Sequence, residues 1–143
     1  MPPISARRAG RAIGVLAAAG LFGALGSGTA SAAIPIGQQQ SGNMTYYTDA
    51  GYGACGTQIN ASTQYLVAVS YQWWTTANPN VDPLCSGISV KVSYQGKTIT
   101  VPVEDKCPSC AAGHIDLSEP AFAELAPLSE GNVSGITWEF VQS

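Results

Sequence analysis

The chain has 143 residues, with six basic and nine acidic side chains and a net charge of −3 at pH 7. Contacts to nucleic-acid phosphates require clustered lysine and arginine, so this composition argues against nucleic acid as a partner. Once the N-terminal segment is set aside, about 110 residues remain, enough for one domain whose core is small enough for cross-links to matter.

Residues 1–32 have the three-part pattern of a secretory signal peptide. Three arginines give a cationic start, IGVLAAAGLFGALG is an apolar centre, and Ala-Ser-Ala forms a small-residue cleavage site ending at residue 32. No second apolar run of about 20 residues follows, so we expect a soluble, secreted, extracellular protein without a membrane span. Export removes the arginines and leaves three lysines against nine acids, a net charge of −6.

The segment 33–42 is rich in glutamine and is expected to be a flexible leader before a compact domain at 43–143. That domain is predicted to be mainly β-structure. It begins with a β-prone run at 43–48, which a glycine-rich turn at 49–53 ends. The short apolar run at 66–69 is typical of a buried strand.

The best hairpin in the sequence lies further along the chain. Apolar and polar side chains alternate along 88–94 and again along 97–103, and Gln95-Gly96 supplies the turn between them. A final strand is expected at 136–140, where every second residue is apolar, and this spacing predicts one buried face.

One segment favours a helix. Ser118 can cap its start, Glu119 and Pro120 suit its first turn, and Pro127 stops it. Asp116 therefore lies just before a helix start. The positive end of a short helix would modestly favour the ionised form of this carboxyl.

Four cysteines follow the signal segment, and export should expose them to an oxidising environment. Four cysteines allow three pairings, and sequence alone does not select among them. We favour Cys55 with Cys85 and Cys107 with Cys110, because the first bridge closes a long loop and the second needs little chain movement. By loop-closure entropy, a bridge across about 30 residues stabilises by roughly 3 to 4 kcal/mol, and a four-residue ring by less.

Zinc binding and redox chemistry are alternatives for the C-x-x-C motif. Cys107, Cys110 and His114 have zinc-ligand spacing, and Asp116 or another cysteine could complete four ligands. Oxidation competes with ligation outside the cell, so we expect no metal and no cofactor. A thioredoxin-like motif opens a helix after a strand, whereas Pro, Gly and small residues surround this one. We therefore favour a structural disulfide.

Aromatic residues and the chain's one histidine are candidate binding groups. Trp73 and Trp74 are adjacent, so in an extended segment one faces the core and the other is exposed. An exposed Trp would be a binding anchor for a sugar or a protein. His114, two residues before Asp116, either shuttles protons or hydrogen-bonds a loop backbone.

Five blocks occur in order along the chain. They are Thr45-Tyr-Tyr, Gly53-Ala-Cys-Gly56, Val101-Pro-Val-Glu-Asp-Lys-Cys-Pro-Ser-Cys110, His114-Ile-Asp-Leu-Ser118 and Gly135-Ile-Thr-Trp-Glu-Phe140. Together they resemble the double-psi β-barrel shared by expansin first domains, rare-lipoprotein-A-like domains and barwin. The match covers essentially all of the chain after the signal segment. It implies a mainly β fold, a small six-stranded barrel with one short helix, stapled by disulfides.

The resemblance also implies a polysaccharide-binding cleft. Asp116 matches an aspartate on the glycan-binding surface of expansins. In related endoglucanases, the aspartate at this position is the catalytic acid. Asp105 and Thr45 match two further cleft residues, and Asp49 follows Thr45 at the spacing of the enzymes' catalytic base. Hydrolysis of a glycosidic bond needs one protonated and one ionised carboxyl group. The sequence identifies no secure pair of this kind, so we expect that the protein is not an enzyme. The candidate glycan cleft comprises Thr45, Tyr47, Asp49, Asp105, His114 and Asp116.

Further blocks indicate a different function. Ile34-Pro-Ile-Gly37, Trp73-Trp-Thr-Thr76, Asn78-Pro-Asn80 and Asp82-Pro-Leu-Cys85 resemble small secreted papain inhibitors built on this barrel. This implies a monomeric inhibitor of papain-like cysteine endopeptidases, with serine endopeptidases as a further class, whose rigid loops dock at little entropic cost. The candidate inhibitory loops carry Trp73, Trp74, Pro83, Leu84, Pro108 and Ser109. The alternative is a domain that binds or loosens cell-wall polysaccharide, or one that retains glycan-cleaving activity.

Overall fold

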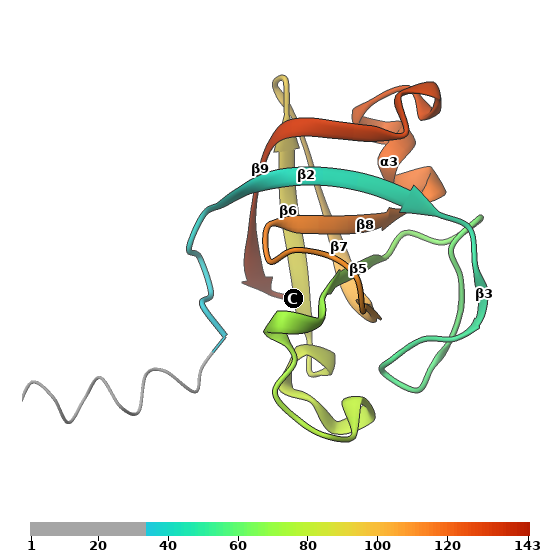
Figure 1. The fold of residues 1–143 in the computed structure, drawn as a ribbon, viewed down its shortest axis with the longest axis vertical. Coiled ribbons are helices and arrows are strands. Elements are labelled where there is room, and N and C mark those ends of the chain that lie inside the picture. The colour runs from blue at the N-terminus through green and yellow to red at the C-terminus, as the bar shows by residue number, and fades with distance from the viewer. Residues whose placement is uncertain (1–33) are drawn as a thin grey trace, which may run out of the picture. The chain divides into compact units, whose positions relative to one another are not determined.

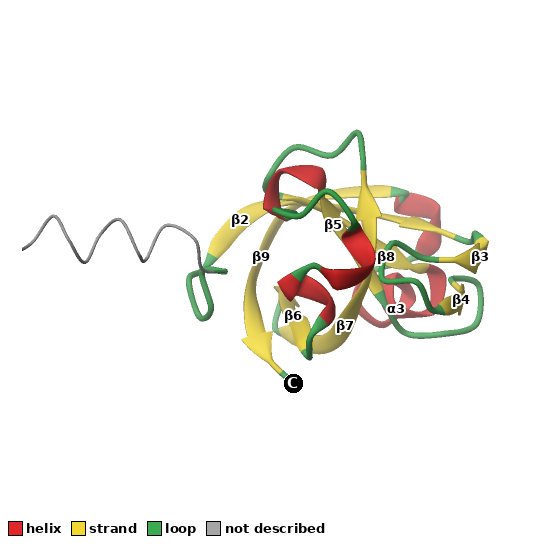
Figure 2. Ribbon diagram, turned by 90° about the horizontal axis from the view of Figure 1, so that it is seen from below, coloured by secondary structure: helices red, strands yellow, loops and turns green. Residues whose placement is uncertain are grey.

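A computed structural model describes residues 34–143, so the predicted signal peptide at 1–32 lies outside the described residues. Six strands close into a barrel, which Figure 2 shows as a ring of arrows. They are β2 (Gln40–Tyr47), β5 (Val67–Ser70), β6 (Ile88–Tyr94), β7 (Lys97–Cys107), β8 (His114–Ser118) and β9 (Asn132–Gln142). Their order around the barrel is β2-β8-β5-β7-β6-β9. The predicted fold class, a six-stranded double-psi β-barrel with one short helix, is confirmed.

The barrel mixes parallel and antiparallel neighbours. β2 is parallel to β8 and β5 is parallel to β7, whereas the other neighbouring pairs are antiparallel. The connections between strands carry the remaining elements. These are the ribbon of β3 (Ala50–Tyr52) and β4 (Gln58–Asn60), the 3-10 turns η2 (Tyr71–Trp73), η3 (Pro79–Val81), η4 (Pro83–Cys85) and η5 (Leu128–Glu130), and the helix α3 (Glu119–Leu125).

Alternate residues of each strand point into the barrel and form its core. Ile136, Trp138 and Phe140 of β9 are buried, as their spacing predicted. Trp138 and Phe140 pack edge to face, with ring centroids 5.1 Å apart. The other fully buried strand residues of this core include Met44, Val67, Val69, Val90, Val92, Ile115 and Leu117.

The predicted hairpin is confirmed as β6 and β7. Gln95 and Gly96 have φ angles of 48° and 83°, the left-handed conformation that a two-residue hairpin turn requires. β7 continues past its predicted end at residue 103 as far as Cys107, because its second half pairs with β5. This extension places Asp105 in the wall of the barrel.

The chain before residue 43 differs from the expected flexible leader. β2 begins at Gln40, and Ile36 forms a parallel bridge with Phe140. The main-chain N–H of Gly37 donates to the Phe140 oxygen at 2.8 Å. Ile34 packs against the main core, so apolar contact and strand pairing hold a segment whose composition indicated mobility.

The expected glycine-rich turn at 49–53 is also different. Residues 50–52 form β3, which pairs with β4 in a two-stranded ribbon outside the barrel sheet. Figure 1 shows β3 at the right-hand edge of the domain. Gly51 has a φ of 131°, so the glycine that suggested a turn bends a strand instead.

The predicted helix is confirmed as α3, but its cap is not. Ser118 occupies the N-cap position, yet its side chain makes no capping hydrogen bond. The Ser118 hydroxyl instead accepts from the Leu66 N–H at 3.1 Å and joins the helix start to the chain entering β5. Phe122 of α3 packs on Tyr46, with ring centroids 5.0 Å apart. No helix within residues 34–143 is long and apolar enough to cross a bilayer.

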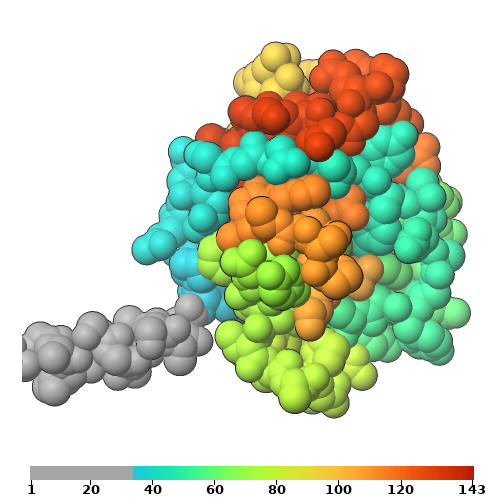
Figure 3. Space-filling model, viewed as in Figure 1, coloured from blue at the N-terminus to red at the C-terminus, as the bar shows by residue number. Residues whose placement is uncertain are grey.

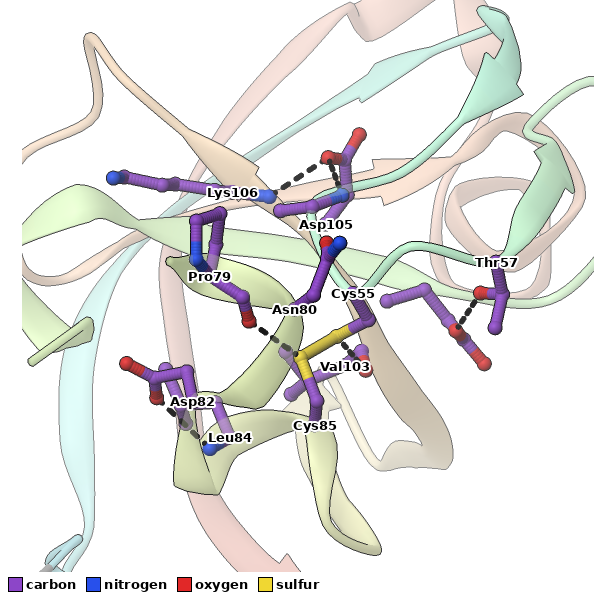
Figure 4. Close-up of a disulfide and its surroundings, with 12 residues drawn as sticks. Cys55, Thr57, Pro79, Asn80, Asp82, Leu84, Cys85, Val103, Asp105 and Lys106 are labelled. Carbon is purple, nitrogen blue, oxygen red and sulfur yellow. Dashed lines mark hydrogen bonds between the residues drawn. A yellow bond between two sulfur atoms is a disulfide. The ribbon is translucent and has the colours of Figure 1, made fainter. Parts of the chain in front are cut away.

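Both expected disulfides are present. Cys55–Cys85 joins the ribbon to the end of η4, with Cα atoms 5.5 Å apart (Figure 4). Cys107–Cys110 closes a four-residue ring directly after β7. None of the cysteines in the described part of the chain is free, so the zinc and dithiol alternatives lack the thiolates that they need.

Candidate functional site

The candidate cleft is built by the register of four neighbouring strands. Thr45 of β2 lies opposite Asp116 of β8, Asp116 lies opposite Ala68 of β5, and Ala68 lies opposite Asp105 of β7. Residues directly opposite each other on paired strands project from the same face of a sheet. Two carboxyl-bearing residues therefore flank Ala68, which is 3% exposed and packs with Tyr47 and the Cys107–Cys110 ring.

Thr45 links His114 to Asp116 through hydrogen bonds. Its hydroxyl donates to Asp116 Oδ1 at 2.9 Å and lies 2.8 Å from His114 Nε2. A hydroxyl has one proton to donate, so the Thr45 oxygen must accept from the histidine. This assigns a proton to His114 Nε2 and makes Thr45 the bridge between the imidazole and the carboxylate. His114 is thus bonded through Nε2 to a side chain of the candidate cleft, and its part in proton transfer stays a prediction.

Burial raises the pKa of the Asp116 carboxyl above its ordinary value of 3.8. The hydrogen bond from Thr45 and the charge of His114 oppose this shift, whereas the carboxylates of Asp49 and Asp105 add to it. The net direction is opposite to the one that the nearby helix start predicted, because α3 is short and desolvation outweighs it. The raised pKa of Asp116 favours its protonated form, the form in which a carboxyl can act as a general acid.

Asp105 has a structural role. Its Oδ2 accepts from the Tyr47 hydroxyl at 2.9 Å, and its Oδ1 accepts from the main-chain N–H groups of Ala54 and Lys106, each at 2.9 Å. The Ala54 bond fastens the ribbon to β7. Burial, with the neighbouring Asp105 carboxylate, raises the pKa of Tyr47 above its ordinary range. The Tyr47 ring is held in this network beside Ala68 and the Cys107–Cys110 ring.

Asp49 lies apart from this row. It is exposed directly before β3, and its main-chain oxygen accepts from the Ala61 N–H at 2.8 Å. Its charge still reaches the cleft, because it raises the pKa values of both Asp116 and Tyr47. The six candidate cleft residues therefore form two hydrogen-bonded groups, Thr45 with His114 and Asp116, and Tyr47 with Asp105, while Asp49 lies at the periphery.

The tryptophan pair does not lie in a regular extended segment. Trp73 ends η2, and Trp74 follows it with an extended backbone. Trp74 is 9% exposed and belongs to the main core, as expected for one of the pair. The Trp expected to be exposed is instead half-buried: Trp73 packs against the core, and its indole N–H donates to the Ala112 oxygen at 2.8 Å.

The other candidate inhibitory residues differ in exposure. Leu84 is 0% exposed and belongs to the main core, so it cannot contact a partner as its loop position suggested. Pro83, Pro108 and Ser109 are exposed. Pro108 and Ser109 lie inside the Cys107–Cys110 ring, where the short disulfide limits their movement.

Asp82 was not recognised from sequence as the centre of this region. Its Oδ2 accepts from Thr75 N, Thr76 N and the Thr76 hydroxyl at 2.8, 3.0 and 2.9 Å, and its Oδ1 accepts from Leu84 N at 3.0 Å. Burial opposes ionisation of this carboxyl, but the four donors outweigh burial and lower its pKa. The only available signal was the aspartate before proline, which is typical of turn initiation.

Two exposed apolar residues were also missed. Tyr71 is 47% exposed on η2 and Val81 is 69% exposed on η3. Strand and helix periodicity could not identify them, because both lie in 3-10 turns. Among residues 34–143 there is no group of three His, Cys, Asp or Glu side chains arranged to hold a metal ion.

Comparison with known proteins places this geometry among relatives. A family described as "Lytic transglycolase" matches residues 39–136. A "Papain inhibitor" from Streptomyces mobaraensis is 66% identical over 128 residues, which cover 90% of this chain and 88% of that protein. An allergen homologue from Arthroderma benhamiae is 30% identical over 129 residues, which cover 81% of this chain and 44% of that protein.

Solved structures similar to this chain include a papain inhibitor and an expansin. The "Streptomyces papain inhibitor" superposes with a TM-score of 0.76 and 68% identity over 77% of this chain and 100% of that one. A mutant Clavibacter michiganensis expansin in complex with cellohexaose superposes with a TM-score of 0.56 and 26% identity, over 73% of this chain and 51% of the expansin. The chain thus spans about half the length of the allergen homologue and of the expansin.

Proposed function

The chain belongs to the lytic transglycolase family of double-psi β-barrels, and from that premise we propose that it is a secreted, monomeric inhibitor of papain-like cysteine endopeptidases. The observation that carries this proposal is the 66% identity to a papain inhibitor over 90% of the chain.

The loops of the domain have the rigidity that an inhibitor needs. The Cys55–Cys85 bridge holds one end of the segment 71–85, and four hydrogen bonds to Asp82 hold its middle. Loops that are ordered before binding lose little conformational entropy when they dock. A standard-size interface can then be tight without a large change of shape.

Titration of papain with the purified mature domain tests the proposal. We expect loss of protease activity in proportion to added protein, reaching completion near one molecule per papain. Asp116→Asn should inhibit as well as the wild type does, because Asp116 belongs to the candidate cleft and not to the candidate inhibitory loops. A serine endopeptidase titrated in parallel defines whether the inhibition extends beyond the cysteine class. Full papain activity at a large molar excess of the domain would contradict the proposal.

A second candidate function is binding to a cell-wall polysaccharide. The row of Thr45, Asp116, Ala68 and Asp105 favours it, together with the likeness to an expansin solved with cellohexaose. We propose binding without hydrolysis, since Asp105 is held by three hydrogen bonds and Asp49 lies at the periphery. Hydrolysis would require a second carboxyl placed to act on the sugar opposite Asp116.

Sedimentation with cellulose and with peptidoglycan tests this second function. Binding that Asp116→Asn weakens would support it, and wild-type protein that stays entirely in the supernatant would contradict it. Release of soluble sugar by the wild type, abolished in Asp116→Asn, would show that the domain is an enzyme after all.

A further inference from the structure

A segment between β5 and β6 projects from the barrel as a compact lobe. We define the lobe as residues 71–85, which contain η2, η3 and η4. Figure 3 shows it in green to yellow-green at the lower edge of the molecule, below the orange segment around residue 110. Leu84 anchors the lobe in the barrel core, and Cys85 anchors it to the ribbon.

The lobe is ordered by its own side chains. Each of its three turns is preceded by a residue whose side-chain oxygen accepts from the main-chain N–H two positions on. These capping residues are Ser70, Asn78 and Asp82. Such compact loops, packed by their own side chains and with a covalent tie, present a fixed surface.

The lobe is fastened to the C-x-x-C loop, residues 107–113. The Ser70 hydroxyl donates to the Cys110 oxygen at 2.8 Å, and the Trp73 indole N–H donates to the Ala112 oxygen at 2.8 Å. The two loops therefore form one surface, which we call the lobe surface. Its exposed residues include Tyr71, Val81, Pro83, Pro108 and Ser109.

The lobe surface is free of carboxylates although the mature chain carries nine acidic residues. No Asp, Glu, Lys or Arg occurs at 107–113, and the single charged residue of the lobe, Asp82, is 1% exposed. The cores of protein interfaces are depleted in charged residues and enriched in aromatic ones. An uncharged patch with two exposed apolar side chains, Tyr71 and Val81, has that composition.

The ribbon exposes Tyr52, and the segment after β4 exposes Tyr65, but carboxylates lie near both. The Tyr65 hydroxyl donates to Glu124 at 2.6 Å, and Thr57 donates to Glu104 at 3.0 Å. Asp49 lies directly before β3. Docking on the ribbon would remove these charges from water, which is unfavourable unless the partner supplies matching cations.

We infer that a papain-like cysteine protease docks on the lobe surface, with Tyr71 and Val81 as its apolar anchors. This rests on the proposed function and assigns its contact face. The cleft of Thr45, His114 and Asp116 lies outside that face. Since the lobe is held by caps and a disulfide before it meets the protease, its affinity depends on the few exposed anchors.

The test compares inhibition constants for papain between matched variants. Tyr71→Ala and Val81→Glu should each raise the inhibition constant by about tenfold or more, as expected for anchors at the centre of an interface. Tyr52→Ala removes a more exposed tyrosine from the ribbon, and Thr100→Glu adds a charge on β7 opposite Lys91. Both controls should inhibit as the wild type does.

The outcomes separate this inference from the proposed function. A wild-type domain that does not inhibit papain overturns both. Suppose instead that the wild type inhibits papain. If the lobe variants then have unchanged inhibition constants, or if Tyr52→Ala weakens inhibition as much as they do, only the assignment of the contact face is overturned. Thermal unfolding checks that each variant is folded. Gln72→Arg, which adds a charge at an exposed position of η2, replaces any lobe variant that fails to fold. We expect Gln72→Arg to inhibit papain at least about tenfold more weakly than the wild type does.

Discussion

The Asp116 carboxyl is a group whose burial favours its protonated form. A raised folded-state pKa means that the folded chain holds the proton more tightly than the unfolded chain. The stability that this group contributes is therefore complete below about pH 4 and is lost as the pH rises through its folded-state pKa. Asparagine cannot ionise and avoids that loss.

We expect Asp116→Asn to gain stability relative to the wild type between about pH 4 and pH 7. Urea unfolding at a series of pH values measures this gain. Thr45→Val removes the hydrogen bond that opposes the pKa shift, so in that variant the loss of stability should extend to higher pH and be larger. A difference between wild type and Asp116→Asn that stays constant with pH would contradict the assignment.

Asp82 has the opposite pH dependence. Its lowered pKa contributes stability that is present above about pH 4 and lost as the pH falls through the folded-state value. Asp82→Ala should lower the free energy of unfolding by about 3 kcal/mol at pH 7, because four donors, one of them buried and three partly buried, lose their acceptor. Asp82→Asn keeps the volume and one acceptor oxygen, so a smaller loss is expected. A cost of Asp82→Ala within about 0.5 kcal/mol would show that the four bonds contribute little.

At the scale of elements, the strands and the helix that were predicted correctly are those marked by a pattern of neighbouring residues. The β6–β7 hairpin follows from strict alternation and a Gln-Gly turn, and α3 follows from a proline at each end. The Ser118 cap failed because a tertiary partner, the Leu66 N–H, uses the hydroxyl. The β3–β4 ribbon was missed because the bond that fastens it to β7, from the Ala54 N–H to Asp105, joins residues that are 51 positions apart.

The candidate cleft was identified by resemblance and only partly by residue pattern. Asp105 and Asp116 are 11 positions apart, and no local spacing shows that both flank Ala68. That proximity arises from strand register, which depends on closure of the barrel. Both loops of the lobe surface were named from sequence as candidate inhibitory loops. Their union into one surface was missed for the same reason as the cleft, since it requires Ser70 and Trp73 to bind the loop at 107–113.

The two disulfides should contribute unequally. Replacing Cys55 and Cys85 together by alanine should cost about 4 kcal/mol, whereas replacing Cys107 and Cys110 should cost about 2 kcal/mol, because the first loop is much longer. Urea unfolding of the two double variants measures the difference. Equal costs would indicate that native-state contacts, not loop closure, determine the contribution of the bridges.

At the scale of the whole molecule, the two proposed functions use different residues of the domain. The carboxyl-bearing row lies across β2, β8, β5 and β7, whereas the uncharged lobe surface is formed by the connections between strands. Connections can vary without disturbing the core, so one barrel fold can present different binding faces. Both a papain inhibitor and an expansin are accordingly similar in structure to this chain.

Hydrogen–deuterium exchange of the mature domain, free and mixed with papain, tests the account most directly. We predict slower exchange on complex formation in the segments 71–81 and 107–113, with no change in the ribbon at 50–60 or in β8. Unchanged exchange throughout the domain at saturating papain, or protection confined to β8 and the cleft, would contradict it.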